Sequence, residues 1–192
     1  MQVRSVLTAL AVMVTVSAIG MAPAHAESSS RVDDNSFASQ ARAGKLSERQ
    51  AEALQGRVDV YLQKTGGKQI SLNEIKLDNG VLRVAVPGEA HPRDFVNAPT
   101  SVALADRCLD GQNNGWFCAY SSTGFQGDTL QWYTCGTYNM PWTGYGSWRN
   151  NQTSGTVAKF INASGSVIYS TPGAYSSSLS YVWTPVYKVK PC

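Results

Sequence analysis

The fold of this 192-residue chain is decided by the stretch Phe117-Cys118-Ala119-Tyr120-Ser121-Ser122-Thr123-Gly124-Phe125-Gln126-Gly127. Its first residues end a β run, Trp116–Tyr120, which is rich in aromatic side chains. A turn rich in serine and glycine follows, and a second β run, Thr129–Thr134, comes after it. Short β runs separated by turn residues are typical of small antiparallel domains.

Further β runs recur toward the C-terminus, and no stretch of residues 105–192 shows a sustained helical period. These runs are Val157–Ile161, Ser166–Ser170, Tyr181–Trp183 and Val186–Lys190. In the last run, Tyr187 and Val189 alternate with Lys188 and Lys190, which predicts one dry and one wet face. The spacing predicts a small antiparallel sandwich or Greek-key domain.

Composition divides the chain at about residue 105. Residues 105–192 hold all four Cys, all five Trp and 16 aromatic residues, but only three Leu. Residues 27–104 hold no Cys or Trp. This shift argues for two folding units. A net charge of +3, thinly spread, gives no indication of nucleic-acid binding, and two His exclude a zinc-rich protein.

Four Cys in a domain of under 100 residues predict two disulfides, with three possible pairings. We favour Cys108–Cys118, which brackets a turn-rich segment, and Cys135–Cys192, which would fasten the chain end to the sheet. The second loop would restrict the unfolded ensemble by roughly 4 kcal/mol in the chain-entropy model. A metal site is disfavoured because the chain has no C-x-x-C spacing.

The first 26 residues resemble an export signal. Arg4 precedes an apolar run, Val6–Ile19, and Ala24-His25-Ala26 supplies a small-x-small pattern that predicts cleavage after Ala26. A membrane anchor is the alternative, but the run is shorter than the ~20 residues that a bilayer span needs. We therefore expect a secreted, extracellular protein with no membrane association after signal removal.

Between the signal and residue 105 the sequence predicts three segments. Residues 27–44 are polar and predicted to be disordered, and residues 45–87 form a helix followed by a β-hairpin. A capping box, Ser47–Gln50, begins that helix, and Asp78-Asn79-Gly80 forms the hairpin turn. Residues 88–105, which contain Pro92 and Pro99 and directly follow Pro87, are predicted to be a linker. The helix–hairpin unit is interpreted as a spacer or cap, or as an inhibitory or folding-assisting prosegment.

A candidate partner-binding loop lies between Gly136 and Arg149. Aromatics, Met and Arg among Gly and Pro are the composition of interface anchors, and a loop beside Cys135 would lose little entropy on docking. The alternative is that the aromatics fill the core of a leucine-poor domain. The candidate residues are Tyr138, Met140, Pro141, Trp142, Tyr145, Trp148 and Arg149.

Catalytic residues are not predicted. His91 is the only His after the signal, and it lies in the predicted linker. The aromatic domain offers only Asp106, Asp110 and Asp128 as acids, and an Asp on a turn is more often a backbone acceptor. Half of a calcium site is a candidate at Asn150, Asn151 and Ser154, with a plain polar turn as the alternative; no other cofactor is expected.

The quoted stretch resembles the βγ-crystallin Greek-key signature, in which an aromatic residue, a folded hairpin and an aromatic-x-Gly precede a strand. The resemblance places Gly127 where the hairpin folds back over Tyr120, a position that a Cβ would crowd. With the Cys placing, the segment 150–155 and the terminal Lys-Pro-Cys, residues 106–192 resemble peptidase inhibitor family I36, a secreted actinobacterial group related to a metalloproteinase inhibitor.

This resemblance implies a mainly β protein, a βγ-crystallin-like Greek-key sandwich over residues 106–192 with two disulfides, preceded by the helix–hairpin unit. It implies a proteinaceous inhibitor rather than an enzyme, which acts on an extracellular peptidase of the metallopeptidase class through a rigid surface loop. The alternatives are a cell-wall or glycan-binding aromatic module and a calcium-stabilised structural protein.

Overall fold

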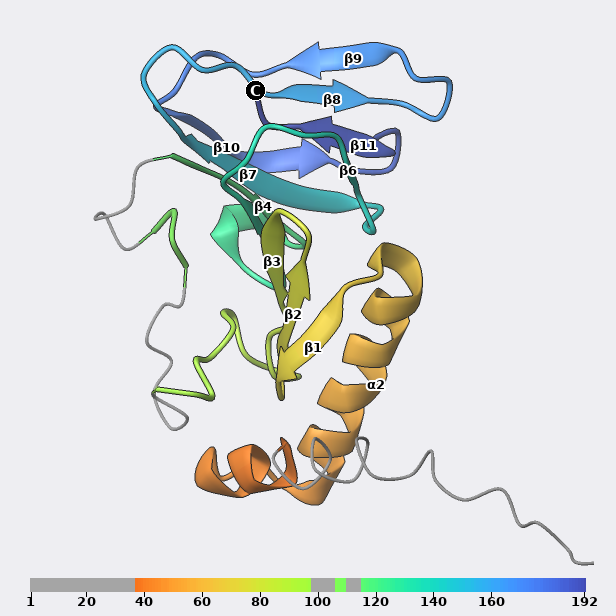
Figure 1. Cartoon of the computed structure of the whole chain (residues 1–192), viewed down its shortest axis with the longest axis vertical. Coiled ribbons are helices and arrows are strands. Elements are labelled where there is room, and N and C mark those ends of the chain that lie inside the picture. Colours follow the sequence, from red (N-terminus) through yellow and green to blue (C-terminus); the bar gives the residue numbers. More distant parts are fainter. Residues whose placement is uncertain (1–36, 98–105, 110–114) are drawn as a thin grey trace, which may run out of the picture.

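The computed structural model describes residues 37–97, 106–109 and 115–192, which form two helical segments followed by two antiparallel sheets (Figure 1). The predicted signal, residues 1–26, lies outside the described residues. A helical segment over residues 37–43 comes first. It is followed by α2 Glu48–Thr65, β1 Lys68–Ser71, β2 Glu74–Leu77, β3 Gly80–Arg83, β4 Trp116–Tyr120, η1 Thr123–Phe125, β5 Thr129–Trp132, β6 Tyr138–Asn139, β7 Tyr145–Asn151, β8 Lys159–Ile161, β9 Val167–Ser170, β10 Ser176–Val182 and β11 Lys188–Lys190.

Helix α2 begins at the predicted capping box. The backbone N–H of Gln50 donates to the Ser47 hydroxyl, and the Ser47 N–H donates to the Gln50 side chain, so two backbone groups at the helix start are satisfied. Gly66, with a φ of 68°, ends the helix, and its N–H donates to the carbonyl of Leu62. Leu54 and Val58 are fully buried on the face that packs against the β structure.

The described part of the predicted disordered region, residues 37–43, is helical, so that prediction is wrong there. Apolar contacts explain it, because Ala41 is buried in the same core as Phe95. Phe95 also shows that residues 88–97 are not a free linker, since it is 3% exposed. The Ala90 carbonyl accepts a hydrogen bond from Gly127, which fastens this segment to the β4–β5 turn.

The helix–hairpin region continues the sheet of the C-terminal region. The order of the seven-stranded sheet is β1-β2-β3-β5-β4-β7-β10. The hairpin β2–β3 turns at Asp78-Asn79, as predicted, and its second strand pairs with β5 in a register that places Leu82 opposite Leu130. The sharp shift in composition near residue 105 therefore does not coincide with a break in the sheet.

The four-stranded sheet has the order β6-β11-β8-β9 and stacks on the larger one (Figure 1). Strands β4–β7 and β8–β11 are two successive groups of four. In each group three strands share one sheet, and the third strand, β6 or β10, joins the sheet of the other group. The exchange of one strand in each direction ties the two sheets together.

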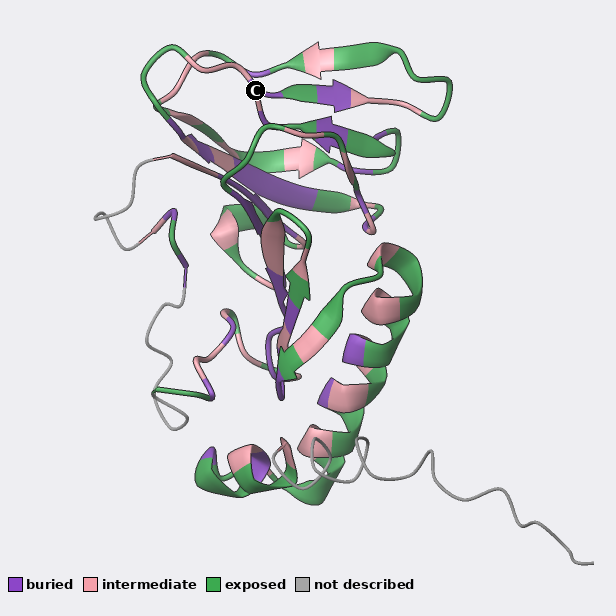
Figure 2. Cartoon of the chain, viewed as in Figure 1, coloured by how far each residue is buried: buried purple, intermediate pink, exposed green. Residues whose placement is uncertain are grey.

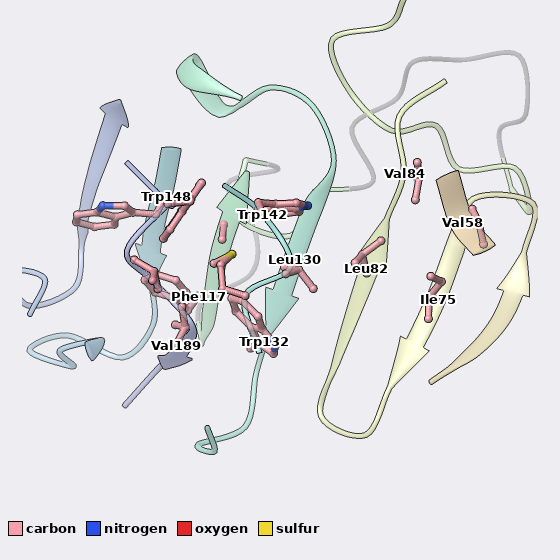
Figure 3. Packing of buried hydrophobic residues seen from close by; sticks show 14 of the residues in the cluster. Val58, Ile75, Leu82, Val84, Phe117, Leu130, Trp132, Trp142, Trp148 and Val189 are labelled. Carbon is pink, nitrogen blue, oxygen red and sulfur yellow. The ribbon is translucent and has the colours of Figure 1, made fainter. Parts of the chain in front are cut away.

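Aromatic rings fill the space between the sheets, as expected for a domain with so few leucines. The Phe117 ring lies 6.1 Å from Trp132, 6.2 Å from Trp148 and, across the sandwich, 6.0 Å from Phe160. Figure 2 shows the buried residues along the facing strands, and Figure 3 shows Val58, Ile75 and Leu82 continuing the same cluster under the hairpin. One core therefore serves the helix–hairpin region and the β domain.

Both predicted disulfides, Cys108–Cys118 and Cys135–Cys192, are present. Strand β4 has the predicted bounds, whereas β10 begins five residues before the predicted run that starts at Tyr181. Strands β6 and β7 were not predicted. The prediction that Tyr187 and Val189 form the buried face of the last strand is correct for Val189 only, because Tyr187 is 59% exposed.

Candidate functional site

The predicted partner-binding loop does not form one exposed face. Met140, Trp142 and Trp148 are 8%, 6% and 1% exposed and belong to the core, so they are corrected to packing residues (Figure 3). These side chains are buried because the domain has few leucines, so that aromatic side chains supply most of the apolar volume for its core. Tyr145 is 68% exposed, on the opposite face of β7 from Trp148.

The remaining candidates of that loop are half-buried. The Arg149 guanidinium lies 5.7 Å from the centre of the Phe125 ring. The Tyr138 ring stacks on Trp132 at 5.5 Å between centroids, which anchors the short strand β6. Pro141 lines a cleft beside α2.

The candidate calcium residues have structural partners. The Asn150 side chain is fully buried, its amide donates to the Thr156 carbonyl at 2.8 Å, and its oxygen accepts from Gln152 at 3.0 Å. Asn151 lies at the end of β7, where its carbonyl accepts from Gly115, while Ser154 is exposed in the following turn. The side-chain oxygen of Asn150 is thus hydrogen-bonded inside the sandwich, and calcium binding at Asn150, Asn151 and Ser154 stays a prediction.

A segment that overlaps the start of the predicted loop at residues 136–139 has the geometry of a rigid surface loop. We call residues 133–139, between the buried end of β5 and strand β6, the Cys135 loop. Tyr133 is 61% exposed, and Thr134, Cys135, Thr137 and Asn139 are exposed as well. The segment therefore leads from the buried strand β5 to the surface of the molecule.

Four contacts fix the Cys135 loop. The disulfide joins Cys135 to Cys192 at the end of the chain, and the Tyr138 hydroxyl donates to the Thr134 carbonyl at 2.7 Å. The Tyr133 ring packs 5.2 Å from Trp116. Strand β6 pairs with β11, which places Tyr138 opposite Val189.

Position 136 is crowded by the Tyr138 side chain. A Cβ there would lie 2.5 Å from the Tyr138 hydroxyl, because the backbone passes directly beneath that ring. Burial of the Tyr138 hydroxyl raises its pKa, which favours the protonated form that donates to Thr134.

The Cys135 loop stands between two hollows. One, of about 320 Å³, is lined by Thr137, Tyr138, the Asp78-Asn79 turn and the end of α2. The other, of about 220 Å³, is lined by Tyr133, Cys135, Thr153 and Cys192. Residues 136–139 of this loop belong to the predicted partner-binding segment, whereas residues 133–135 were not predicted.

A further cleft, of about 330 Å³ and distinct from the two hollows beside the Cys135 loop, separates α2 from the segment 141–143. At its base Arg57 and the Tyr61 hydroxyl both bond to the carboxylate of Asp128, and Trp142 Nε1 donates to the Tyr61 hydroxyl at 3.0 Å. Burial and the neighbouring carboxylate raise the pKa of Tyr61. These groups satisfy one another, so the arrangement fastens α2 to the β domain rather than presenting an acid or base to a substrate.

The remaining titratable groups offer little for chemistry. Asp106 is 3% exposed, and its carboxylate accepts from the Cys108 N–H at 2.8 Å. Among the described residues, a cluster able to hold a metal is formed by Asp106, Cys108 and Cys118, but its two sulfurs are joined in the disulfide. His91 is half-buried beside this region. Asp110 lies outside the described residues.

None of the helices in the described ranges is long and apolar enough to cross a bilayer. A scan against protein-family models and searches of curated proteins and of solved structures find no match to this chain.

Proposed function

We propose that the protein is a secreted proteinaceous inhibitor of a peptidase, and that the Cys135 loop is the part that docks in the peptidase cleft. The observation that carries the proposal is an exposed loop held by a disulfide and by the Tyr138–Thr134 hydrogen bond on a domain with a continuous core. A preorganised loop gives up little conformational entropy on binding, so more of the contact energy becomes affinity.

Two further points support this assignment. The exchange of strands β6 and β10 between the sheets is consistent with the βγ-crystallin-like Greek-key arrangement that the sequence resemblance implies. The two disulfides suit an oxidising, extracellular location. The choice of a metallopeptidase as the target rests on the resemblance. The loop itself does not distinguish between peptidase classes, because its carbonyl oxygens can bind a catalytic metal and can also bond to other peptidases.

The test is to titrate the mature chain against thermolysin-like, subtilisin-like and trypsin-like peptidases. The variant Thr137→Arg changes an exposed residue of the Cys135 loop, and Ser164→Arg makes the same change in an exposed turn between β8 and β9. We expect inhibition of the metallopeptidase, a roughly tenfold or larger loss of affinity in T137R and no change in S164R.

Failure of all three peptidases to be inhibited would remove the proposal. Equal effects of the two variants would remove the Cys135 loop as the docking element. Binding to peptidoglycan or chitin without inhibition would instead favour a glycan-binding module.

A further inference from the structure

The outer face of the four-stranded sheet carries three lysines. In strand β11, Val189 is buried in the core, while Lys188 and Lys190 on either side of it are exposed. In the neighbouring strand β8, Phe160 is buried and Lys159 is exposed. Because successive side chains of a strand point to opposite faces, the three lysines share the face that points away from the core, and we call them the lysine face. Figure 1 shows β8 and β11 side by side in this sheet.

The register places two of these charges directly against each other. Lys190 of β11 lies opposite Lys159 of β8, and Lys188 lies two residues away along β11. Side chains in opposite positions have Cβ atoms about 4.5–5.5 Å apart, and alternate residues of one strand are about 7 Å apart. Like charges directly opposite each other destabilise a sheet. The three ammonium groups therefore form a concentrated positive patch, and a negatively charged partner would remove the repulsion within it.

The lysine face lacks a counter-charge of its own. Residues 129–192, which form both strands, contain no Asp or Glu. In the part of the chain that the structure describes, the ion pairs join arginines to acids and include none of the three lysines. The hairpin also has an opposed pair, Lys68 and Lys76, but Asp78 lines the same hollow as those two lysines. Charge repulsion that the chain itself does not compensate is expected at functional positions.

Neutral polar side chains flank the lysine face on two sides. Asn139 of β6 lies opposite Lys188, and Ser170 of β9 lies opposite Lys159, so both share the outer face. Both residues are exposed. An amide and a hydroxyl donate hydrogen bonds to hydroxyl groups and accept them as well. The face thus combines positive charge at its centre with neutral hydrogen-bonding groups beside it.

We propose that the lysine face binds an anionic polysaccharide, a polymer that presents negative charges and hydroxyl groups together. Charge complementarity selects an anion, and the ammonium group of lysine is a point charge that accepts anionic groups without a fixed planar geometry. A polymer with repeated charges contacts all three lysines at once, whereas a small anion does not span them. Its hydroxyl groups bond to Asn139 and Ser170.

Other anionic partners fit this face less well. Proteins that lie on a bilayer insert large apolar or aromatic side chains beside their cations. Here the apolar residues on the same face are aliphatic, Ile161 opposite Val167, and Ile161 is half-buried. Single-stranded nucleic acid is bound by aromatic stacking and by arginine, and the outward positions of β8 and β11 hold neither.

The experiment measures binding of the mature chain to dextran sulfate by calorimetry at several salt concentrations, with uncharged dextran as the matched polymer. We expect binding to dextran sulfate alone, and an affinity that falls steeply with salt because bound counterions are released. The double variant Lys159→Gln with Lys190→Gln should weaken binding roughly tenfold or more at low salt. It should also reduce the slope of log affinity against log salt by about one for each lysine removed.

The control is Lys68→Gln with Lys76→Gln, which removes an equally opposed and exposed lysine pair from the hairpin. We expect at most a twofold change in affinity for this variant. Thermal unfolding should show that K159Q with K190Q is at least as stable as wild type, because like-charge repulsion is removed. Weaker binding is then not a consequence of unfolding.

Three results would overturn the proposal: no binding of the wild-type chain to dextran sulfate, equal losses in the two double variants, or equally tight binding to phosphatidylglycerol vesicles at the same concentration of charge. Peptidase inhibition is measured on the same variants. Neither Lys159 nor Lys190 belongs to the Cys135 loop, so K159Q with K190Q should inhibit as wild type does. Failure of polysaccharide binding therefore leaves the proposed inhibition standing, and the reverse also holds.

Discussion

Arg57 of helix α2 and Asp128, just before strand β5, form an ion pair across the boundary that composition places between two units. Arg57 Nη2 lies 2.6 Å from Oδ1 and 2.5 Å from Oδ2 of Asp128, whose side chain is 1% exposed. The same carboxylate accepts from the Tyr61 hydroxyl and from the backbone N–H of Ala85. One buried acid therefore joins the helix, the segment after β3 and the β domain.

Replacing this carboxylate should weaken the attachment of α2. Asp128→Asn removes the charge that Arg57 and Tyr61 share, and we expect the free energy of unfolding to fall by about 2–3 kcal/mol. This is less than the roughly 3–5 kcal/mol expected for a fully buried pair, because the Arg57 side chain is 40% exposed and water screens its charge. Denaturant unfolding measures the change. Asp59→Asn, on the exposed face of α2, is the matched control and should stay within about 0.5 kcal/mol of wild type.

The structural effect of Gly127 can be separated into strain and crowding. Gly127 has a φ of 82°, and a Cβ there would lie 2.3 Å from the Ser121 hydroxyl oxygen. Gly144 has a similar φ of 78° but open space around it. Thermal unfolding should show a loss of about 1 kcal/mol for Gly144→Ala, from strain alone, and about 2–3 kcal/mol for Gly127→Ala. Equal losses would show that crowding at Gly127 is relieved at no cost.

Local signals were sufficient for several elements. The Ser47–Gln50 capping box and the Asp78-Asn79-Gly80 turn each depend on a few adjacent residues, so sequence alone predicts them. Strand β7 was missed because its Gly, Ser, Arg and Asn residues have no strand propensity. Its interior polar groups become favourable only through distant partners: Ser147 donates to the carbonyl of Ser122 and accepts from Phe125.

The candidate site was harder to predict for the same reason. Trp142 in a sequence of Gly, Pro and Tyr has the composition of an interface, yet it is buried against Tyr61, 81 positions earlier in the chain. The pairing of β3 with β5 likewise joins residues from the two halves that composition separates. Contacts between distant segments decide whether an aromatic side chain is core or surface, and composition does not encode them.

Asp106 should make stability depend on pH. Burial raises the pKa of Asp106 above its ordinary value of 3.8, and this outweighs the opposing effects of the Cys108 N–H, Tyr120, His91 and Arg83. The folded state therefore holds the proton more tightly than the unfolded state, and the ionised carboxyl lowers stability at neutral pH. This penalty is lost as the pH falls through the folded pKa.

Asp106→Asn tests this sign, because the amide keeps an oxygen for the Cys108 N–H but carries no charge. We expect the variant to be more stable than wild type at pH 7, with the difference shrinking on acidification and absent below the pKa of the unfolded state. Denaturant unfolding at several pH values measures it. A variant less stable than wild type at pH 7 would contradict the assignment.

The two disulfides should differ in what their removal costs. Cys135–Cys192 closes a span of 57 residues and Cys108–Cys118 a span of 10. The chain-entropy model gives losses of about 4 and about 3 kcal/mol for the two double alanine variants. Only Cys135→Ala with Cys192→Ala should also weaken peptidase inhibition, because it frees the docking loop, whereas Cys108→Ala with Cys118→Ala leaves that loop anchored. Inhibition constants are measured at a temperature where both variants remain folded. Loss of inhibition in both variants to the same degree would assign the effect to global stability and not to the Cys135 loop.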